Sequence, residues 1–203
     1  MSLSEASKSR VLTGKDVITT AIFSAIYFVL NMACMLISGL HPMLWILMPA
    51  FIAVLTGIPF LLLCAKVQKP GAVLLMGLIT GLIYTATGQF TPLILITFVI
   101  ACGAAELVRI VTRYSRFWCN ALAFVLFSQG MTGSPLPIWL MRGDFLAQLA
   151  EQGMPAAYVQ TLANLSSPPM LIVLFAAPVA GALIGILLAK VMFRKHFEKA
   201  GMV

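Results

Sequence analysis

The side chains of this sequence that could recognise a small molecule are few, and they lie in or beside long apolar runs. Small-molecule sites are mostly apolar, with a few polar groups that fix the orientation of the ligand. A buried amide needs a hydrogen-bond partner, a methionine suits an adaptable pocket, and an arginine pairs well with a carboxylate. The candidate substrate-binding residues are Asn31, His41, Trp45, Tyr84, Gln89, Gln129, Met131, Trp139 and Arg142.

Several of these candidates also have a purely structural interpretation. The indoles of Trp45 and Trp139 are typical of the aromatic belts that form at membrane interfaces. His41 stands in a turn between two apolar runs, and Arg142 could pair with Asp144. Both interpretations stay open on the sequence alone.

Motifs for catalysis or for resident metal ions are missing from the sequence. It has no Walker A loop, no HExxH and no GxSxG pattern. The two histidines, His41 and His196, fall on opposite sides of the membrane in the topology derived below, so they cannot share a metal ion. The four cysteines form no CxxC pair, which favours packing over metal or disulfide chemistry: Cys34, Cys64, Cys102 and Cys119. We therefore predict neither an enzyme nor a resident cofactor or metal.

The composition indicates an integral membrane protein. Of 203 residues, 61% are hydrophobic and 9% are charged, whereas soluble domains contain about 25% charged residues. This length leaves room for about six spans joined by short connections. We expect one transmembrane domain, 1–203, in a lipid bilayer.

The apolar runs predict an all-α fold with six transmembrane helices. The expected spans are 17–38, 43–65, 72–87, 93–108, 117–140 and 170–192. The connection 141–169 is predicted to hold two short amphipathic helices, 144–150 and 156–165. Two glycines and two prolines in 128–137 predict a broken or unwound segment in the fifth span. Because such backbone is tolerated at membrane depth only when it is buried or lines a cavity, this segment points to a ligand site.

The positions of the basic residues predict the topology. Twelve of the 13 Lys and Arg residues fall in alternate connections together with both termini, and only Arg142 falls in the others. The positive-inside rule then places the N-terminal tail 1–15 and the C-terminal tail 193–203 in the cytoplasm and the loop 141–169 outside. The net charge of +7 therefore needs no nucleic-acid partner. No Lys, Arg, Asp or Glu lies in the middle of a predicted span, except Glu106 near an inner end. The lack of such residues argues against a proton-coupled carrier.

Small residues mark one face of the first span. Ala21 and Ala25 are four residues apart, so they share a helix face on which another helix can approach closely. The face could serve packing within the chain or docking of a partner.

The order of several short motifs resembles the Trep_Strep family of bacterial integral membrane proteins. The motifs are LTGKDVI at 12–18, AIYF at 25–28, GIPF at 57–60, TGQ at 87–89, LP at 136–137 with MR at 141–142, and KHFEKAG at 195–201. That family is similar to the substrate-binding S components of energy-coupling factor (ECF) transporters. The resemblance implies a six-helix membrane fold with an outer ligand site. It also implies a T-type transmembrane coupling subunit that docks on Ala21 and Ala25, and two ABC-type ATPases.

On this resemblance the chain is expected to be an S component in the cytoplasmic membrane of a bacterium. It would capture a small organic nutrient, vitamin-like or tetrapyrrole-like, while ATP is used by the partner ATPases. The alternatives are a self-contained secondary transporter or channel, and, with no catalytic constellation to support it, a membrane enzyme.

Overall fold

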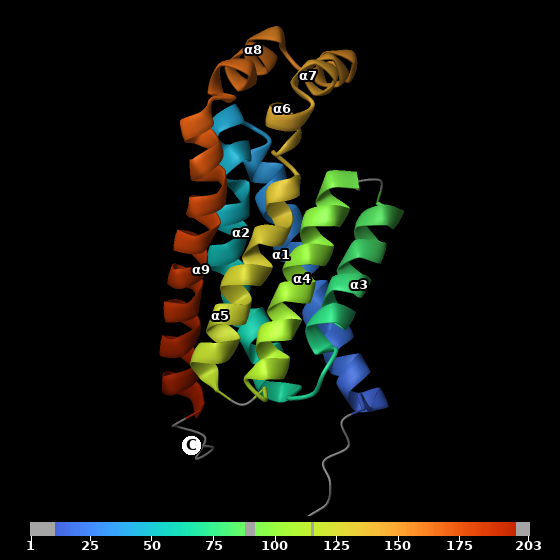
Figure 1. Cartoon of the computed structure of the whole chain (residues 1–203), viewed down its shortest axis with the longest axis vertical. Coiled ribbons are helices and arrows are strands. Elements are labelled where there is room, and N and C mark those ends of the chain that lie inside the picture. The colour runs from blue at the N-terminus through green and yellow to red at the C-terminus, as the bar shows by residue number, and fades with distance from the viewer. Residues whose placement is uncertain (1–10, 88–91, 115, 198–203) are drawn as a thin grey trace, which may run out of the picture.

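The computed structural model describes residues 11–87, 92–114 and 116–197, and helices dominate this part of the chain (Figure 1). The longer helices are α1 (Gly14–Ser38), α2 (Pro42–Lys66), α3 (Ala72–Ala86), α4 (Pro92–Val111), α5 (Phe117–Phe127) and α9 (Pro168–Phe197). Between α5 and α9 lie the 3₁₀-helix η1 (Ser128–Gly133) and the helices α6 (Pro137–Leu140), α7 (Arg142–Glu151) and α8 (Ala156–Leu165). The all-α prediction is confirmed for the described residues, including two short helices in the last connection.

Four helices are long and apolar enough to cross a membrane: α1, α2, α4 and α9. Helix α3 is apolar but has only 15 residues, which at about 1.5 Å per residue is shorter than a hydrocarbon core of about 30 Å. The fifth predicted span is divided among α5, η1 and α6. The structure thus supports four spans by length and composition, and two of the six predicted spans correspond to shorter segments.

Helix α1 turns its polar side toward the other helices. From Val17 onward its exposed residues are all apolar, which reverses the pattern of a helix in a soluble protein. The hydroxyl groups of Thr20 and Ser24 each donate to the carbonyl oxygen four residues earlier, at 2.8 Å. Polar groups are thereby satisfied without water, as a membrane interior requires. The buried residues of α1 are Thr20, Ser24, Tyr27, Asn31, Cys34 and Ser38.

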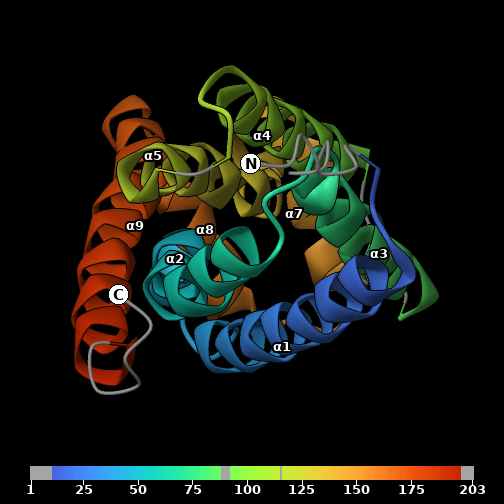
Figure 2. The same cartoon turned by 90° about the horizontal axis from the view of Figure 1, so that it is seen from below.

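Helix α2 is the central helix of the bundle, and it lies between α1, α5 and α9 (Figure 2). In its apolar stretch 61% of the residues are buried, against 28% in α1, 39% in α4 and 33% in α9. Helix α9 approaches α2 backbone to backbone. A Cβ atom added to Gly57 would lie 2.9 Å from Cα of Gly185, and Gly181 packs against the carbonyl oxygen of Ala50. Small residues of α9 therefore make its contact with α2 possible.

Gly185→Val is expected to lower the stability of the protein by about 1–3 kcal/mol, because overpacking a tight contact forces the helices apart. A Cβ at this position would lie 2.6 Å from the carbonyl oxygen of Ala53. The thermal unfolding midpoint in detergent measures the effect. Ala180→Val, at an exposed position of the same helix, is the matched control. Equal midpoints for the two variants would show that the α2–α9 contact tolerates a side chain.

The segment that follows α5 departs from α-helical backbone where it packs against α4. A Cβ on Gly130 would lie 2.5 Å from Cδ2 of Phe98, and Gly133 packs against the side chain of Thr97. The Thr97 hydroxyl donates to the carbonyl oxygen of Gly130 at 2.7 Å. The prediction of a broken fifth span is therefore confirmed, and the irregular backbone is buried in protein, as membrane depth requires.

The six segments α1, α2, α3, α4, α5–η1–α6 and α9 alternate in direction along the long axis (Figure 1). We call the end where α1 begins and α9 ends the basic end, and the opposite end, covered by α6, α7 and α8, the cap end. Within the described residues, Arg142 is the one Lys or Arg at the cap end. The basic end holds Lys15, Lys66, Lys69, Arg109, Arg113, Arg116, Lys190 and Arg194.

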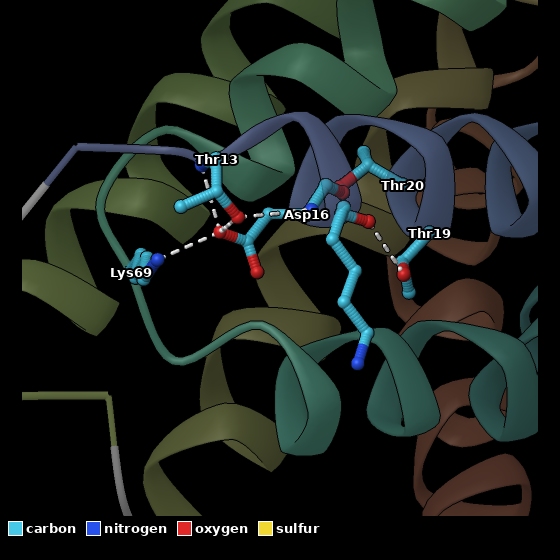
Figure 3. Close-up of polar contacts among 6 residues, drawn as sticks. Thr13, Asp16, Thr19, Thr20 and Lys69 are labelled. Carbon is cyan, nitrogen blue, oxygen red and sulfur yellow. Dashed lines mark hydrogen bonds and ion pairs between the residues drawn. The ribbon is translucent and has the colours of Figure 1, made fainter.

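The start of α1 is tied to the connection between α2 and α3 (Figure 3). Thr13 and Asp16 form a capping box, in which Thr13 N donates to Asp16 Oδ2 at 2.8 Å. Lys69 Nζ lies 2.7 Å from the same oxygen. A partly exposed ion pair of this kind contributes at most about 1 kcal/mol, but it fixes where α1 enters the bundle. The cap also starts the helix at Gly14, ahead of the predicted run 17–38, because Thr13 satisfies its first amide groups.

Candidate functional site

A groove of about 340 Å³ lies between α3 and α4. The leucines along its edges are exposed on the lipid-facing surface of the bundle, so the groove opens sideways toward lipid. Its lining is almost entirely apolar, and none of the lining residues is charged. The lining residues are Leu74, Gly77, Leu78, Gly81, Leu82, Tyr84, Thr85, Ile94, Leu95, Phe98, Val99, Cys102 and Met131.

Two glycines of α3 define the groove, each in a different way. A Cβ on Gly77 would lie 2.6 Å from Sγ of Cys102, so this glycine brings α3 into contact with α4. Gly81, one turn later, has no atom within 4 Å of an added Cβ and leaves the space open. The two helices thus touch at Gly77 and leave a groove beside Gly81.

Aromatic side chains form the wall behind the groove. The Tyr84 ring lies edge-on to Phe28, with 5.2 Å between the ring centroids. Its hydroxyl donates to Sδ of Met35 at 3.7 Å. Phe98 belongs to a second group of rings, with its centroid 6.5 Å from that of Tyr27. Because Tyr84, Phe98 and Met131 are all buried, the wall is fixed by packing from α1 and η1.

Besides Arg109 Nη1, which lies beside Glu106, three buried polar atoms in the described part of the bundle have no hydrogen-bond partner: Asn31 Oδ1, Thr80 Oγ1 and Gln129 Oε1. The amide nitrogen of Asn31 does donate, to the carbonyl oxygen of Tyr27 at 2.9 Å. Most hydroxyls on neighbouring helices bond to a carbonyl oxygen in the preceding turn, as Thr56 does at 2.8 Å. An unsatisfied buried polar atom costs about 1–3 kcal/mol, so these three atoms mark places where a ligand could contribute a hydrogen bond.

The cap end carries two of the predicted site residues, Trp45 and Trp139, in a small core of its own. Trp45 stacks on Phe145 of α7, with 5.8 Å between ring centroids and 9° between planes. Trp139 donates from Nε1 to the carbonyl oxygen of Ser167 at 3.0 Å. Burial raises the pKa of the nearby Tyr158 phenol, so this side chain stays neutral. Both indoles pack against buried Ile46, Ile138, Leu162 and Leu174.

Arg142 begins α7 and is exposed. Its Nη2 donates to the carbonyl oxygen of Ala163 at 2.7 Å, and no ion pair joins it to Asp144 among the described residues. His41 caps α2, where its Nδ1 accepts from Met43 N at 3.2 Å. The turn interpretation of His41 therefore has direct structural support.

The structure brings two of the nine predicted substrate-binding residues, Tyr84 and Met131, to the groove. Asn31 is buried on the inner face of α1. Gln129 donates weakly across to α9, from Nε2 to the carbonyl oxygen of Phe175 at 3.4 Å. Gln89 lies outside the described residues, as do parts of both predicted tails. The substrate-binding role of all nine residues stays a prediction.

The predicted docking face on α1 is only partly accessible. Ala25 is exposed between larger apolar side chains, whereas Ala21 is half-buried. A partner helix would therefore meet Ala25 directly.

At the basic end, a buried carboxylate holds the start of α3. Glu106, on α4, is 2% exposed. Its Oε1 accepts from Gly71 N at 2.8 Å, and its Oε2 accepts from Val73 N at 3.0 Å. The carboxylate thus caps a helix from another helix, where the positive end of the helix dipole favours an anion.

Arg109 completes this buried polar network and is fully buried. Its Nη1 lies 3.5 Å from Glu106 Oε2, an ion-pair distance without hydrogen-bond geometry. Nη2 donates to the carbonyl oxygen of Val67 at 2.8 Å, and Nε donates to Asn120 Oδ1 at 3.3 Å. Residues three apart on a helix can pair in this way, so the ion pair is the one that their spacing favours. The spacing did not show that the pair links α2, α3, α4 and α5.

Phe98, Cys102 and Gly81 are groove residues that sequence reasoning missed. The signal available in the sequence is the spacing of Gly77 and Gly81, a GxxxG pattern that favours a close helix contact. It identified the contact at Gly77 but not the open space at Gly81, because which side of α3 faces α4 follows from the packing of the whole bundle.

Comparison with known proteins identifies one family. The family described as hypothetical bacterial integral membrane protein (Trep_Strep) matches residues 14–199. No curated protein and no solved structure matches the chain. The polar side of α1 faces inward and four helices are apolar enough to span a membrane, as expected for an integral membrane protein. The chain belongs to the Trep_Strep family of bacterial integral membrane proteins.

Proposed function

We propose that the protein is the substrate-binding S component of an ECF-type importer, and that the groove between α3 and α4 binds its ligand. The observation that carries the proposal is this groove: about 340 Å³, apolar, and walled by fixed aromatic side chains. Such a site suits a small, largely apolar organic molecule. A vitamin-like or tetrapyrrole-like nutrient has this character.

The proposed topology has six membrane segments, with α3 and the α5–η1–α6 segment completing the four longer helices. The alternating directions bring the start of α1 and the end of α9 to the same end of the bundle (Figure 1). Because described basic residues concentrate there, the positive-inside rule supports a cytoplasmic basic end and an outer cap end. The membrane is then the cytoplasmic membrane of a bacterium.

Import by this protein would draw its energy from partner subunits. Of the acidic side chains in the described spans, Glu106 is the one buried in the bundle, and it is paired with Arg109 and bonded to two backbone amides. It is therefore engaged in structure and poorly suited to carry protons. This supports a T-type coupling subunit with two ABC-type ATPases as the motor.

Co-purification from the native membrane in mild detergent tests the proposal. Mass spectrometry should find a T-type membrane subunit and two ABC-type ATPases with the tagged chain. A chain that is recovered alone, and that transports in liposomes under an ion gradient, would overturn the proposal in favour of a secondary transporter.

Ala25→Trp is expected to abolish co-purification of the coupling subunit and to leave ligand binding unchanged. Ala25 is exposed on α1, and a large side chain there would prevent the close approach that small residues allow. Ala176→Trp, at an exposed position on α9, is the matched control and should keep the complex intact. If Ala25→Trp lost the ligand as well, the face would serve folding and not docking.

A further inference from the structure

The acidic groups that the structure describes at the basic end are already neutralised by partners. Asp16 pairs with Lys69, and Glu106 pairs with Arg109. The other acidic residues that the structure describes, Asp144 and Glu151, belong to α7 at the cap end. The cations that form no ion pair with a described acidic side chain make up an exposed positive rim: Lys15, Lys66, Arg113, Arg116 and Lys190.

One part of this rim also carries an exposed tryptophan. Lys190 Nζ, on α9, lies over the Trp118 ring at 4.8 Å from its centroid, and Trp118, in the first turn of α5, is 62% exposed. Phe117 and Phe193 hold the two helices together beside this pair, with 6.3 Å between ring centroids. Arg116 immediately precedes α5 and is exposed. We call Arg116, Trp118 and Lys190 the α5–α9 seam.

An apolar strip continues from the seam toward the middle of the bundle. Leu122 follows Trp118 by one turn of α5, and Leu187 and Leu183 precede Lys190 on α9. All three leucines are more than half exposed. The surface therefore presents cations at the level of the membrane interface and apolar side chains beside them at the level of the acyl chains.

We propose that the α5–α9 seam binds an anionic phospholipid, with the phosphate between Arg116 and Lys190 and an acyl chain along the leucine strip. Tryptophan favours this interfacial depth, and each Lys or Arg near an anionic surface adds to lipid attraction. The charge of the seam matches the headgroup, and its apolar strip matches the acyl chain. A soluble acidic protein would match only the first of these. The proposal stands independently of any transport function.

Fluorescence quenching by brominated lipids tests the site directly. In the full chain carrying Trp45→Phe and Trp139→Phe, Trp118 is the one remaining tryptophan. In phosphatidylcholine bilayers, brominated phosphatidylglycerol should quench Trp118 more strongly than brominated phosphatidylcholine. Lys190→Gln should reduce this preference about fivefold, the effect of one charge at the surface, and added salt should weaken it as well.

Arg142→Gln, which removes a cation at the cap end, is the control and should leave the preference unchanged. Native mass spectrometry of the otherwise unaltered protein gives a second readout, because Lys190→Gln should retain less phosphatidylglycerol than Arg142→Gln. Equal quenching by the two brominated lipids, or a preference that Lys190→Gln does not change, would overturn the lipid site. That result would leave an acidic surface of a partner protein as the ligand of the rim.

Discussion

Replacing Arg109 by alanine is expected to destabilise the protein by about 3–5 kcal/mol, the cost of leaving one member of a buried ion pair without its partner. The guanidinium is fully buried. It bonds to the carbonyl oxygen of Val67 and to the side chain of Asn120 and lies beside Glu106. Its loss would leave the buried Glu106 carboxylate without a counter-charge and disconnect the ends of α2 and α5. The loss of folded protein on heating in detergent, followed by size-exclusion chromatography, measures the effect.

Arg116→Ala provides the control for this prediction, because Arg116 is an exposed basic residue at the same end of the bundle. A surface substitution of this kind normally changes stability by less than about 0.5 kcal/mol. Adding Glu106→Gln to Arg109→Ala should recover part of the loss, since the unpaired charge is then removed. If Arg109→Ala were no more harmful than Arg116→Ala, the buried pair would not hold the helices together.

The local features of this fold could be predicted from sequence because each one depends on short-range chemistry. The length of the apolar runs predicts the helices, and the two glycines and two prolines in 128–137 predict the break after α5. The spacing of Glu106 and Arg109 gives their pairing, which follows from helix geometry alone. The early start of α1 could also have been found, since Thr13 and Asp16 have the spacing of a capping box.

The site was harder to predict because it depends on how helices distant in sequence pack together. The predicted contacts Gln129, Trp45 and Trp139 lie outside the groove lining. The groove instead depends on Gly81, Phe98 and other residues without notable chemistry. Which glycine of α3 touches α4 and which leaves space is set by helix rotation, and a single sequence does not specify it.

Filling the groove should separate its role in binding from its role in folding. Gly81→Phe is expected to lower ligand occupancy about tenfold or more, a loss of at least about 1.4 kcal/mol of binding free energy. An added side chain meets no atom within 4 Å of its Cβ, so it can enter the open space without a clash. Substitution of this helical glycine also removes its conformational cost. The small molecules that co-purify with each variant, extracted and quantified by mass spectrometry, measure occupancy.

Two other glycines give this prediction its contrast. Gly77→Phe would drive a side chain into Cys102, where even the Cβ lies 2.6 Å from Sγ, so this variant should lose both stability and ligand. Gly103→Phe, on α4, also has open space around its Cβ but lies outside the groove lining, and it should keep both. If Gly81→Phe and Gly103→Phe carried equal amounts of ligand, the groove would be a lipid-filled surface feature and the ligand would bind elsewhere. The cap end, with Trp45, Trp139 and Arg142, would then be the next place to substitute, because its indoles and guanidinium are the remaining predicted contacts that lie together.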